Sequence, residues 1–245
     1  MAPVLTIFMP ALNEELSIGR TVRAALAAGD DLVASGTVTG FEVLVVDDGS
    51  TDDTPAVLAA LGTERPEVVT VRHPVNRGVG AAMRTGFSSA AGDLVLYTDA
   101  DLPADLAVVG DLVRTLERDR AGVVAAYRRT RSGEGARRAV YSGVYNLLVR
   151  AVLGLRVRDV NFALKLVRSD VLDVVTLRSN GILIDAELLA RADRAGFRIV
   201  QVGVDYLPRL AGVSTMASWP RLLELARESR TIVPELLASP RQARR

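Results

Sequence analysis

The chain has 245 residues, of which 49% are hydrophobic and 24% are charged, and its formal net charge is +1. This composition is that of an ordinary globular protein, and the near-neutral charge argues against nucleic acid or another polyanion as a partner. The absence of cysteine excludes disulfides, thiolate metal sites and thiol nucleophiles, and makes the cytoplasm the expected compartment. The first residues lack the basic region and cleavage site of a signal peptide, and no run of about 18 apolar residues predicts a membrane-spanning helix.

Strands and helices alternate through the first half of the chain. Apolar runs predict strands at 4–9, 41–46, 68–72, 94–97 and 122–127. Helices are expected from about residue 13 to 28, from a cap at 50 or 51, from 80 to 91, and from 104 to 119. This order predicts an α/β fold with a mostly parallel, doubly wound sheet flanked by helices.

The second half is less regular. Residues 128–138 are polar and read as a loop, followed by a helix at 139–153, a strand at 160–167, a helix near 185–195 and a strand at 197–204. Apolar residues of 218–237 share one helical face, with Pro234 as a kink. We therefore expect one domain over 1–215, and an amphipathic helix with a basic tail over 216–245. This tail either packs on the domain or on the second subunit of a homodimer, or contacts a membrane surface.

Two carboxylates, Asp99 and Asp101, follow the buried strand at 94–97. The carboxyl edge of an open α/β sheet is where ligands bind. Alternate residues of an extended segment point the same way, and carboxylates are the oxygen ligands that Mg²⁺ or Mn²⁺ takes while keeping positions open for phosphate. The pair therefore indicates a metal-diphosphate site; an acidic turn that caps the next helix is the alternative.

Two other strands end at the same edge. Asp47 closes the second strand, where a carboxylate can accept hydrogen bonds from a ribose or a base. After the first strand, the backbone of residues 10–13 can line a nucleobase slot and Glu14 can reach the ribose. For Asp47 the alternative is an ordinary capped turn.

A glycine-rich segment follows the third strand, with Gly78 and Gly80 before a helix. It is not a dinucleotide-binding fingerprint, because Met83 occupies the third glycine position and the motif does not open the chain. We interpret it as a turn that lets the helix start close under a nucleotide. His73, the only histidine, is expected to be a structural hydrogen-bonding group.

Arginines flank the polar loop. Arg128 and Arg138, together with Arg209, offer guanidinium groups suited to phosphate oxygens, and a closing loop would exclude water from a diphosphate. Solvent-exposed arginines without a ligand are the alternative.

Taken together, these motifs resemble the inverting family 2 glycosyltransferases of the GT-A fold. The residues that carry the resemblance are Pro10, Asn13, Glu14, the segment 46–52, Asn76, Gly78, Gly80, Ala82 and the segment 99–102. A second set resembles the polyprenyl-phosphate (dolichyl-phosphate) mannosyl- and glucosyltransferase branch: Arg128, Arg138, Ser142, Asn146, Asp159, Lys165, Asp185, Glu187, Leu188, Arg209, Gly212 and Ser214. The resemblance covers about residues 4–215.

The resemblance implies transfer of a hexose from a nucleotide diphosphate sugar, of the GDP-mannose or UDP-glucose type, to a polyprenyl phosphate with inversion. It implies a divalent cation, Mg²⁺ or Mn²⁺, held by Asp101 with help from Asp99. The implied donor-binding residues are Pro10, Leu12, Asn13, Glu14, Asp47, Gly78, Asp99 and Ala100. The implied catalytic residues are Asp101, Arg128, Arg138, Asp185 and Arg209, and the implied acceptor-binding residues are Arg128, Arg138, Ser142, Arg209 and Ser214. A lipid acceptor places the protein in the cytoplasm or at the inner face of the membrane.

Departures from the branch leave alternatives open. Pro103 stands where the lipid-phosphate mannosyltransferases commonly have Gln, and Thr215 where they commonly have Lys. A soluble hydroxyl acceptor, with a carboxylate base at Asp185 or Glu187, is therefore the first alternative. A catalytically inactive nucleotide-sugar-binding protein is another, although the intact acidic pair argues against it.

Overall fold

The computed structural model describes residues 2–129, 145–147, 149–150, 152–207, 219–238 and 241–243, with the backbone alone for 219–226. Within these ranges, none of the helices combines the length and the apolar character needed to cross a membrane.

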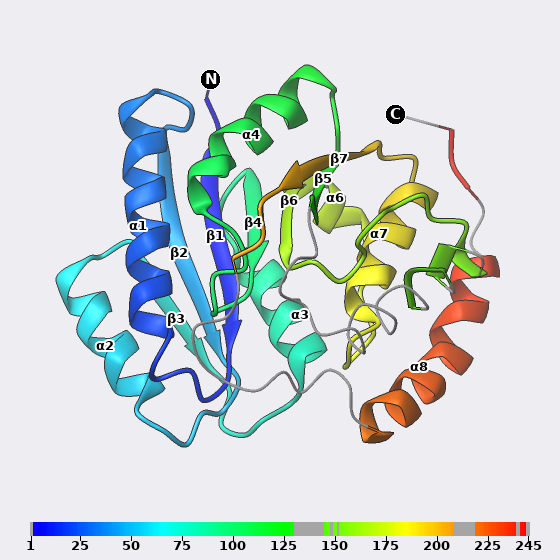
Figure 1. Cartoon of the computed structure of the whole chain (residues 1–245), viewed down its shortest axis with the longest axis horizontal. Coiled ribbons are helices and arrows are strands. Elements are labelled where there is room, and N and C mark those ends of the chain that lie inside the picture. Colours follow the sequence, from blue (N-terminus) through cyan, green and yellow to red (C-terminus); the bar gives the residue numbers. More distant parts are fainter. Residues whose placement is uncertain are drawn as a thin grey trace.

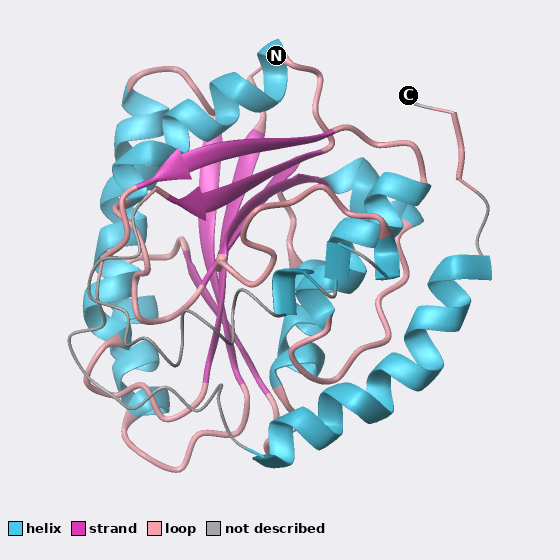
Figure 2. Cartoon of the chain, turned by 45° about the vertical axis from the view of Figure 1, so that its right-hand side comes forward, coloured by secondary structure: helices cyan, strands magenta, loops and turns pink. Residues whose placement is uncertain are grey.

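Seven strands form one sheet at the centre of the molecule (Figure 1). They are β1 (Val4–Ala11), β2 (Gly40–Asp47), β3 (Val68–Arg72), β4 (Leu94–Thr98), β5 (Val123–Arg128), β6 (Leu164–Arg168) and β7 (Ile199–Val204). Their order is β3-β2-β1-β4-β6-β5-β7, and only β6 is antiparallel to its neighbours β4 and β5. The predicted mostly parallel α/β sheet is confirmed, and Figure 2 shows its strong twist.

Helices cover both faces of the sheet. One face carries α1 (Ile18–Ala34), α2 (Thr54–Glu64), the short 3₁₀ helix η1 (Leu106–Val108) and α4 (Val109–Arg118). The other carries α3 (Val79–Ser89), α6 (Ser169–Val174), α7 (Ile184–Arg194) and α8 (Trp219–Ala238). The described residues between 145 and 153 are also helical, as predicted for that segment. This two-sided covering explains why β1, β2 and β4 read as continuous apolar runs rather than alternating ones.

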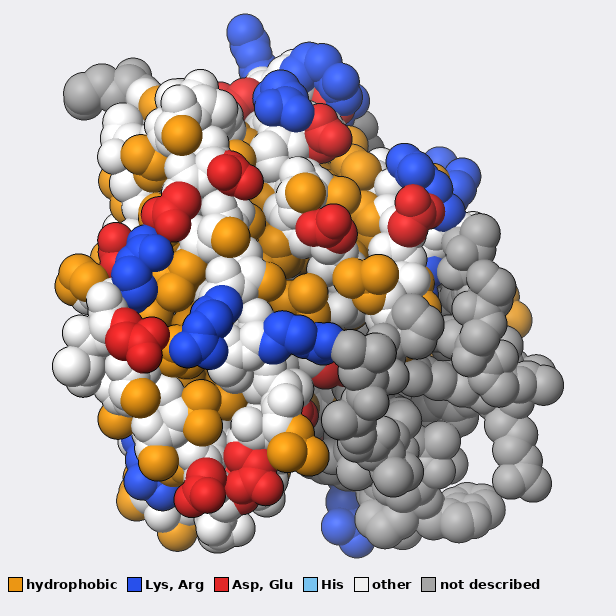
Figure 3. All heavy atoms as spheres, turned by 60° about the vertical axis from the view of Figure 1, so that its left-hand side comes forward, with side chains coloured by type: hydrophobic (Ala, Val, Ile, Leu, Met, Phe, Trp, Pro, Cys, Tyr) orange, Lys and Arg blue, Asp and Glu red, His pale blue; other side chains and the backbone are white. Residues whose placement is uncertain are grey.

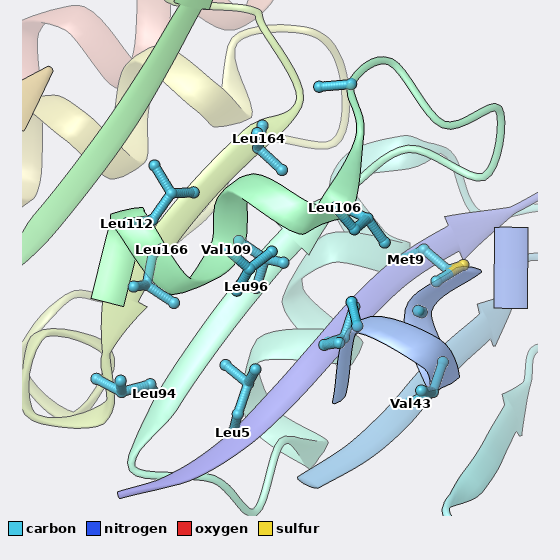
Figure 4. Packing of buried hydrophobic residues seen from close by; sticks show 14 of the residues in the cluster. Leu5, Met9, Val43, Leu94, Leu96, Leu106, Val109, Leu112, Leu164 and Leu166 are labelled. Carbon is cyan, nitrogen blue, oxygen red and sulfur yellow. The ribbon is translucent and has the colours of Figure 1, made fainter. Parts of the chain in front are cut away.

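The first core lies between the sheet and the α1–α4 face. Figure 4 shows Leu5 of β1, Leu96 of β4 and Leu166 of β6 beside Val109 and Leu112 of α4. All five side chains are fully buried or nearly so. The rigid core therefore holds the ends of β1 and β4, and the loops after them, in fixed positions.

Two elements begin later than the sequence predicts. Helix α1 starts at Ile18 and not near residue 13, because the preceding residues are held by the loop after β2. Strand β6 starts at Leu164 and not at residue 160, because the preceding loop turns around Asp159. Helix α6 was not predicted from sequence; it is only 6 residues long, too short for a clear helical period.

Candidate active site

A pocket of about 600 Å³ opens at the carboxyl ends of β1 and β4. The sequence-predicted residues that line it are Pro10, Leu12, Asn13, Glu14, Gly78, Asp99, Ala100, Asp101 and Asp185. Among the predicted donor and metal residues, Asp47 alone is missing from this lining. The topology thus brings segments that are far apart in the sequence to one concave site, at the sheet edge where α/β proteins bind ligands.

The acidic pair lies in a tight turn directly after β4. Asp99 accepts a hydrogen bond from the hydroxyl of Tyr97, with 3.1 Å between the oxygens. The carbonyl of Ala100 accepts a 2.6 Å bond from the hydroxyl of Thr21 in α1, and Leu102 closes the turn at φ +58°. Asp101 is 8% exposed and lines the pocket. The turn is therefore fixed from both sides before any ligand binds.

The donor set suits a divalent cation that is shared with phosphate. Within the described ranges, His, Cys, Asp and Glu form no group of three or more that could hold a metal ion by themselves. Mg²⁺ typically takes one or two carboxylates and completes its shell with water and substrate phosphate. Asp99 and Asp101 match this pattern, and Pro103, which follows them, offers no side-chain ligand.

The loops after β1 and β2 are hydrogen-bonded to each other. Asn13 donates its backbone N–H to the hydroxyl of Ser50, and its side-chain oxygen accepts the N–H of Thr51, both at 2.9 Å. Glu14 donates its N–H to the Thr54 hydroxyl at 2.8 Å. Asn13 also has φ +55°, a left-handed conformation that Asn tolerates better than most residues. These contacts preorganise the pocket wall that was predicted to receive a nucleoside.

Asp47 lies beneath this wall rather than in it. Its side chain is fully buried, and Oδ1 accepts the backbone N–H of Ser50 at 2.9 Å. The Nε of Arg72 lies 3.1 Å from Oδ2 as an ion pair, without the alignment of a hydrogen bond. Asp47 therefore shapes the loop after β2, and its direct contact with a nucleoside stays a prediction.

Asp48, which the sequence reasoning did not assign, lines the pocket and holds the loop after β3. Its carboxylate accepts the backbone N–H groups of Arg77 at 3.0 Å and Gly78 at 2.9 Å. The ring of His73 lies between Asp48, at 2.6 Å, and the hydroxyl of Thr85, at 2.9 Å. The prediction that His73 is structural is confirmed. The one sequence signal for Asp48 was its place in the Asp47-Asp48 pair.

The glycines at 78 and 80 permit close packing between two segments, and the nearby backbone N–H groups bond to protein atoms and do not face a phosphate site. The N–H of Gly80 donates to the carbonyl of Asn180 at 2.9 Å, while those of Arg77 and Gly78 are taken by Asp48. A Cβ at Gly80 would lie 2.3 Å from the carbonyl oxygen of Ser179. The glycines therefore allow the segment 178–181 to approach the start of α3, which agrees with the predicted glycine turn.

We expect Gly80→Ala to destabilise the protein by about 1–3 kcal/mol, because the added methyl group must displace the backbone of the 178–181 segment. Gly62→Ala in α2 is the matched control. Its Cβ would meet only the Val68 carbonyl at 3.5 Å, so a gain of about 0.5–1 kcal/mol is expected. Urea unfolding monitored by circular dichroism measures both; equal stabilities for Gly80→Ala and the wild type would contradict the packing argument.

Asp185 forms a buried ion pair at the pocket wall. Lys165, the only lysine of the chain, is fully buried and donates to Asp185 Oδ1 at 2.6 Å and to the Phe162 carbonyl at 2.7 Å. Its Nζ also lies 5.6 Å from the centre of the Tyr97 ring. Burial raises the pKa of Asp185, and the charge and hydrogen bond of Lys165 act in the opposite direction.

Glu187 is the less suitable of the two carboxylates considered for a base. It is fully buried and accepts the backbone N–H groups of Arg178 at 3.0 Å and Ser179 at 2.8 Å. It also pairs with Arg191 at 2.7 Å. Since these contacts engage both of its oxygens and it does not line the pocket, Asp185 is the carboxylate of α7 that can meet a ligand.

Of the three arginines predicted to bind phosphate, the structure describes Arg128. Arg128 pairs with Asp159, at 2.7 Å between Nε and Oδ2, and its guanidinium lies 5.5 Å from the ring centres of Phe162 and Tyr206. Its side chain is 7% exposed and is not part of the pocket lining. Asn146 supports the same loop by accepting the N–H of Val160 at 2.9 Å. Four further predicted residues lie outside the described ranges: Arg138, Ser142, Arg209 and Ser214.

Solved structures with the same architecture include glucosyl-3-phosphoglycerate synthase from Mycobacterium tuberculosis in complex with phosphoglyceric acid. The TM-score is 0.68 at 26% sequence identity, and the match covers 97% of this chain and 80% of that one. The same enzyme with Mn²⁺, uridine diphosphate and glucosyl-3-phosphoglycerate gives a TM-score of 0.67, with the same identity and coverage. The fold and the site together define a glycosyltransferase of the GT-A fold.

The family follows from the sequence match. The family model described as Glycosyl transferase family 2 matches residues 6–176, and the chain belongs to this family. The resemblance predicted from the motifs is therefore confirmed.

Curated relatives are longer than this chain. Glycosyltransferase AglD of Haloferax volcanii is 30% identical over 213 residues, which is 84% of this chain and 33% of the relative. An undecaprenyl-phosphate 4-deoxy-4-formamido-L-arabinose transferase of Sodalis glossinidius is 33% identical over 173 residues (70% and 51%). A dodecaprenyl-phosphate galacturonate synthase of Rhizobium johnstonii is 30% identical over 174 residues (71% and 50%). The chain thus spans between a third and about half of the length of these relatives.

Proposed function

We propose that the chain is a metal-dependent inverting glycosyltransferase that takes a hexose from a nucleotide diphosphate sugar and passes it to a polyprenyl phosphate. The observation that carries this proposal is the placement of Asp99 and Asp101 at the end of β4, inside a pocket that also gathers every predicted donor-binding residue except Asp47. The family membership and the metal and uridine diphosphate named in the structural neighbour support the donor class.

Each loop of the pocket has a distinct task in this proposal. Asn13 and the loop after β1 would receive the nucleoside, and Asp99 and Asp101 would hold a divalent cation beside the diphosphate. When bound, a divalent cation neutralises the leaving diphosphate, so that the glycosidic bond can ionise toward an oxocarbenium-like state. Tyr97 and Thr21 keep the acidic turn in place, and therefore little reorganisation is needed on binding.

The lipid acceptor rests on two of the named relatives, a transferase whose name includes undecaprenyl phosphate and a synthase whose name includes dodecaprenyl phosphate. A phosphate acceptor is already an anionic nucleophile and needs no general base; cationic groups must hold it near the anomeric carbon. We assign this task to Arg138 and Arg209, with Arg128 holding the loop before β6 in place through its ion pair with Asp159. The protein would then act in the cytoplasm, at the inner face of the membrane.

One observation favours a second acceptor class. Asp185 is a buried carboxylate of the pocket wall. An anion at this place repels a phosphate acceptor but can act as the base that deprotonates a hydroxyl acceptor. The structural neighbour is named glucosyl-3-phosphoglycerate synthase, and 3-phosphoglycerate is a small phosphorylated hydroxy acid. On this alternative the same donor site serves a soluble acceptor.

Figure 3 shows acidic and basic side chains interspersed on one face of the protein, a pattern unlike the single-sign surface of a polyanion-binding protein.

A donor and acceptor screen tests these proposals. Purified protein is incubated with GDP-mannose or UDP-glucose, with Mn²⁺, Mg²⁺ or a chelator, and with a short polyprenyl phosphate or 3-phosphoglycerate. We expect cation-dependent release of nucleotide diphosphate that polyprenyl phosphate accelerates. Asp185→Asn combined with Lys165→Met, with the fold checked by circular dichroism, distinguishes the acceptors, because it removes the carboxylate without leaving an unpaired buried charge; it should spare transfer to a phosphate and remove transfer to a hydroxyl. Turnover that is unchanged by the chelator would contradict the metal assignment.

A further inference from the structure

Helix α8 holds the segment 178–181 through one carboxylate. Glu228 accepts the backbone N–H groups of Asn180 at 2.6 Å and Gly181 at 2.9 Å through Oε1, and the hydroxyl of Ser179 at 2.7 Å through Oε2. Hydrogen bonds to an ionised group are stronger than neutral ones, and here they fix three consecutive residues. The conformation of this segment therefore depends on a residue that lies more than 40 positions away along the chain.

A second carboxylate of α8 supports the same region. Glu235 pairs with Arg178 at 2.7 Å and with Arg191 at 3.4 Å. Ile232 and Leu236, on the same helix, are buried in the core behind α7. Figure 1 shows α8 lying along the outer side of α7. Apolar packing thus seats the helix, and its acidic side chains reach the segment that leads into α7.

The segment 178–181 in turn contacts the start of α3. Asn180 accepts the N–H of Gly80 at 2.9 Å, and Arg84 donates to the Asn180 side-chain oxygen at 2.6 Å and to the Ser179 carbonyl. The chain then continues through Ile182 into α7, and Ile182 and Asp185 line the same pocket as Gly78 and Val79 at the start of α3. Two walls of the pocket, the start of α3 and the start of α7, are therefore joined by this segment.

We propose that Glu228 is a positioning residue for donor binding, an inference that rests on the proposed function. Glu228 sets the distance between the start of α3 and the start of α7, and so the width of the pocket that receives the nucleotide diphosphate sugar. The family match ends at residue 176, before both the segment and α8.

Three variants test the inference. Glu228→Ala removes all three contacts, whereas Glu228→Gln keeps an acceptor for the two N–H groups and a donor for the Ser179 hydroxyl. Arg230→Ala is the control on the same helix, because Arg230 is exposed and, among the described residues, no hydrogen bond or ion pair joins it to the segment. We expect Glu228→Ala to raise KM for the nucleotide sugar about tenfold with kcat changed less than about twofold, and Glu228→Gln and Arg230→Ala to stay within about twofold.

Hydrogen–deuterium exchange separates this inference from the proposed function. Glu228→Ala should speed exchange both in 178–184 and in 78–84 of α3, and Arg230→Ala in neither. Unchanged KM and unchanged exchange at 78–84 in a folded Glu228→Ala protein would overturn the inference. If the wild type turns over no nucleotide sugar, the proposed function fails, and the exchange at 78–84 then decides the structural link by itself.

Discussion

Asp101→Asn is expected to lower glycosyl transfer by about 10³-fold or more while the protein stays folded. The change removes one negative charge from the proposed metal site and keeps the size of the side chain. A cation that neutralises a leaving diphosphate contributes several kcal/mol to the transition state, and each 1.36 kcal/mol corresponds to a factor of about 10. Asp101 lies in a loop at the end of β4 and not in an apolar core, so folding should not depend on its charge.

The matched control is Asp105→Asn in the same loop. Asp105 accepts the N–H of Ala107 at 2.9 Å as the cap of η1 and does not line the pocket. Its replacement should cost at most about 1 kcal/mol of stability and leave turnover unchanged. Turnover is measured with saturating Mn²⁺, and far-ultraviolet circular dichroism checks the fold. Retained transfer in Asp101→Asn would place the metal elsewhere.

Lys165→Met is expected to destabilise the protein by about 3–5 kcal/mol. Methionine fills a similar volume but leaves Asp185 without its cationic partner in a buried site, and breaking a buried ion pair from one side carries a penalty of this size. The Phe162 carbonyl loses its hydrogen-bond donor as well. The single lysine of the chain thus lies in a fully buried site, where the free-energy cost of removing a charge from water is large.

Guanidinium denaturation measures this loss, and Arg114→Ala is the comparison. Arg114 and Asp111 form an ion pair at 2.6 Å in which both side chains are 67% exposed, so its removal should cost less than about 1 kcal/mol. Adding Asp185→Asn to Lys165→Met should recover part of the stability, because the unpaired charge is removed. A loss below about 1 kcal/mol for Lys165→Met would show that water reaches the pair.

Much of the site could be predicted because its signals are local. Asp99 and Asp101 follow an apolar run, and Asn13 and Glu14 follow another, so parallel strands necessarily bring them to one edge. The glycines at 78 and 80 could be recognised as a turn. Their physical reason, the close approach of Ser179 and Asn180, could not, since that contact joins residues about 100 positions apart.

The remaining features depend on packing between distant segments. The antiparallel direction of β6 was not predicted, because an apolar run indicates a strand but not the direction in which the strand pairs with its neighbours. The pairing of Arg128 with Asp159 removes a guanidinium from the pocket lining, although its sequence context suggested a phosphate ligand. Glu228 reads as an interruption of a basic helix face, and only the fold reveals its contacts with Asn180 and Gly181.

Calorimetric titration of the protein with uridine diphosphate and with guanosine diphosphate tests the central claim most directly. Each nucleotide is titrated with Mn²⁺ and with a chelator, into the wild type and into Asp101→Asn. The account predicts that one nucleotide binds the wild type at least about tenfold more tightly with Mn²⁺ than with the chelator, and that Asp101→Asn removes this difference. Binding that is equally tight with and without Mn²⁺, or an equal gain from Mn²⁺ in Asp101→Asn, would contradict a donor site built around this carboxylate.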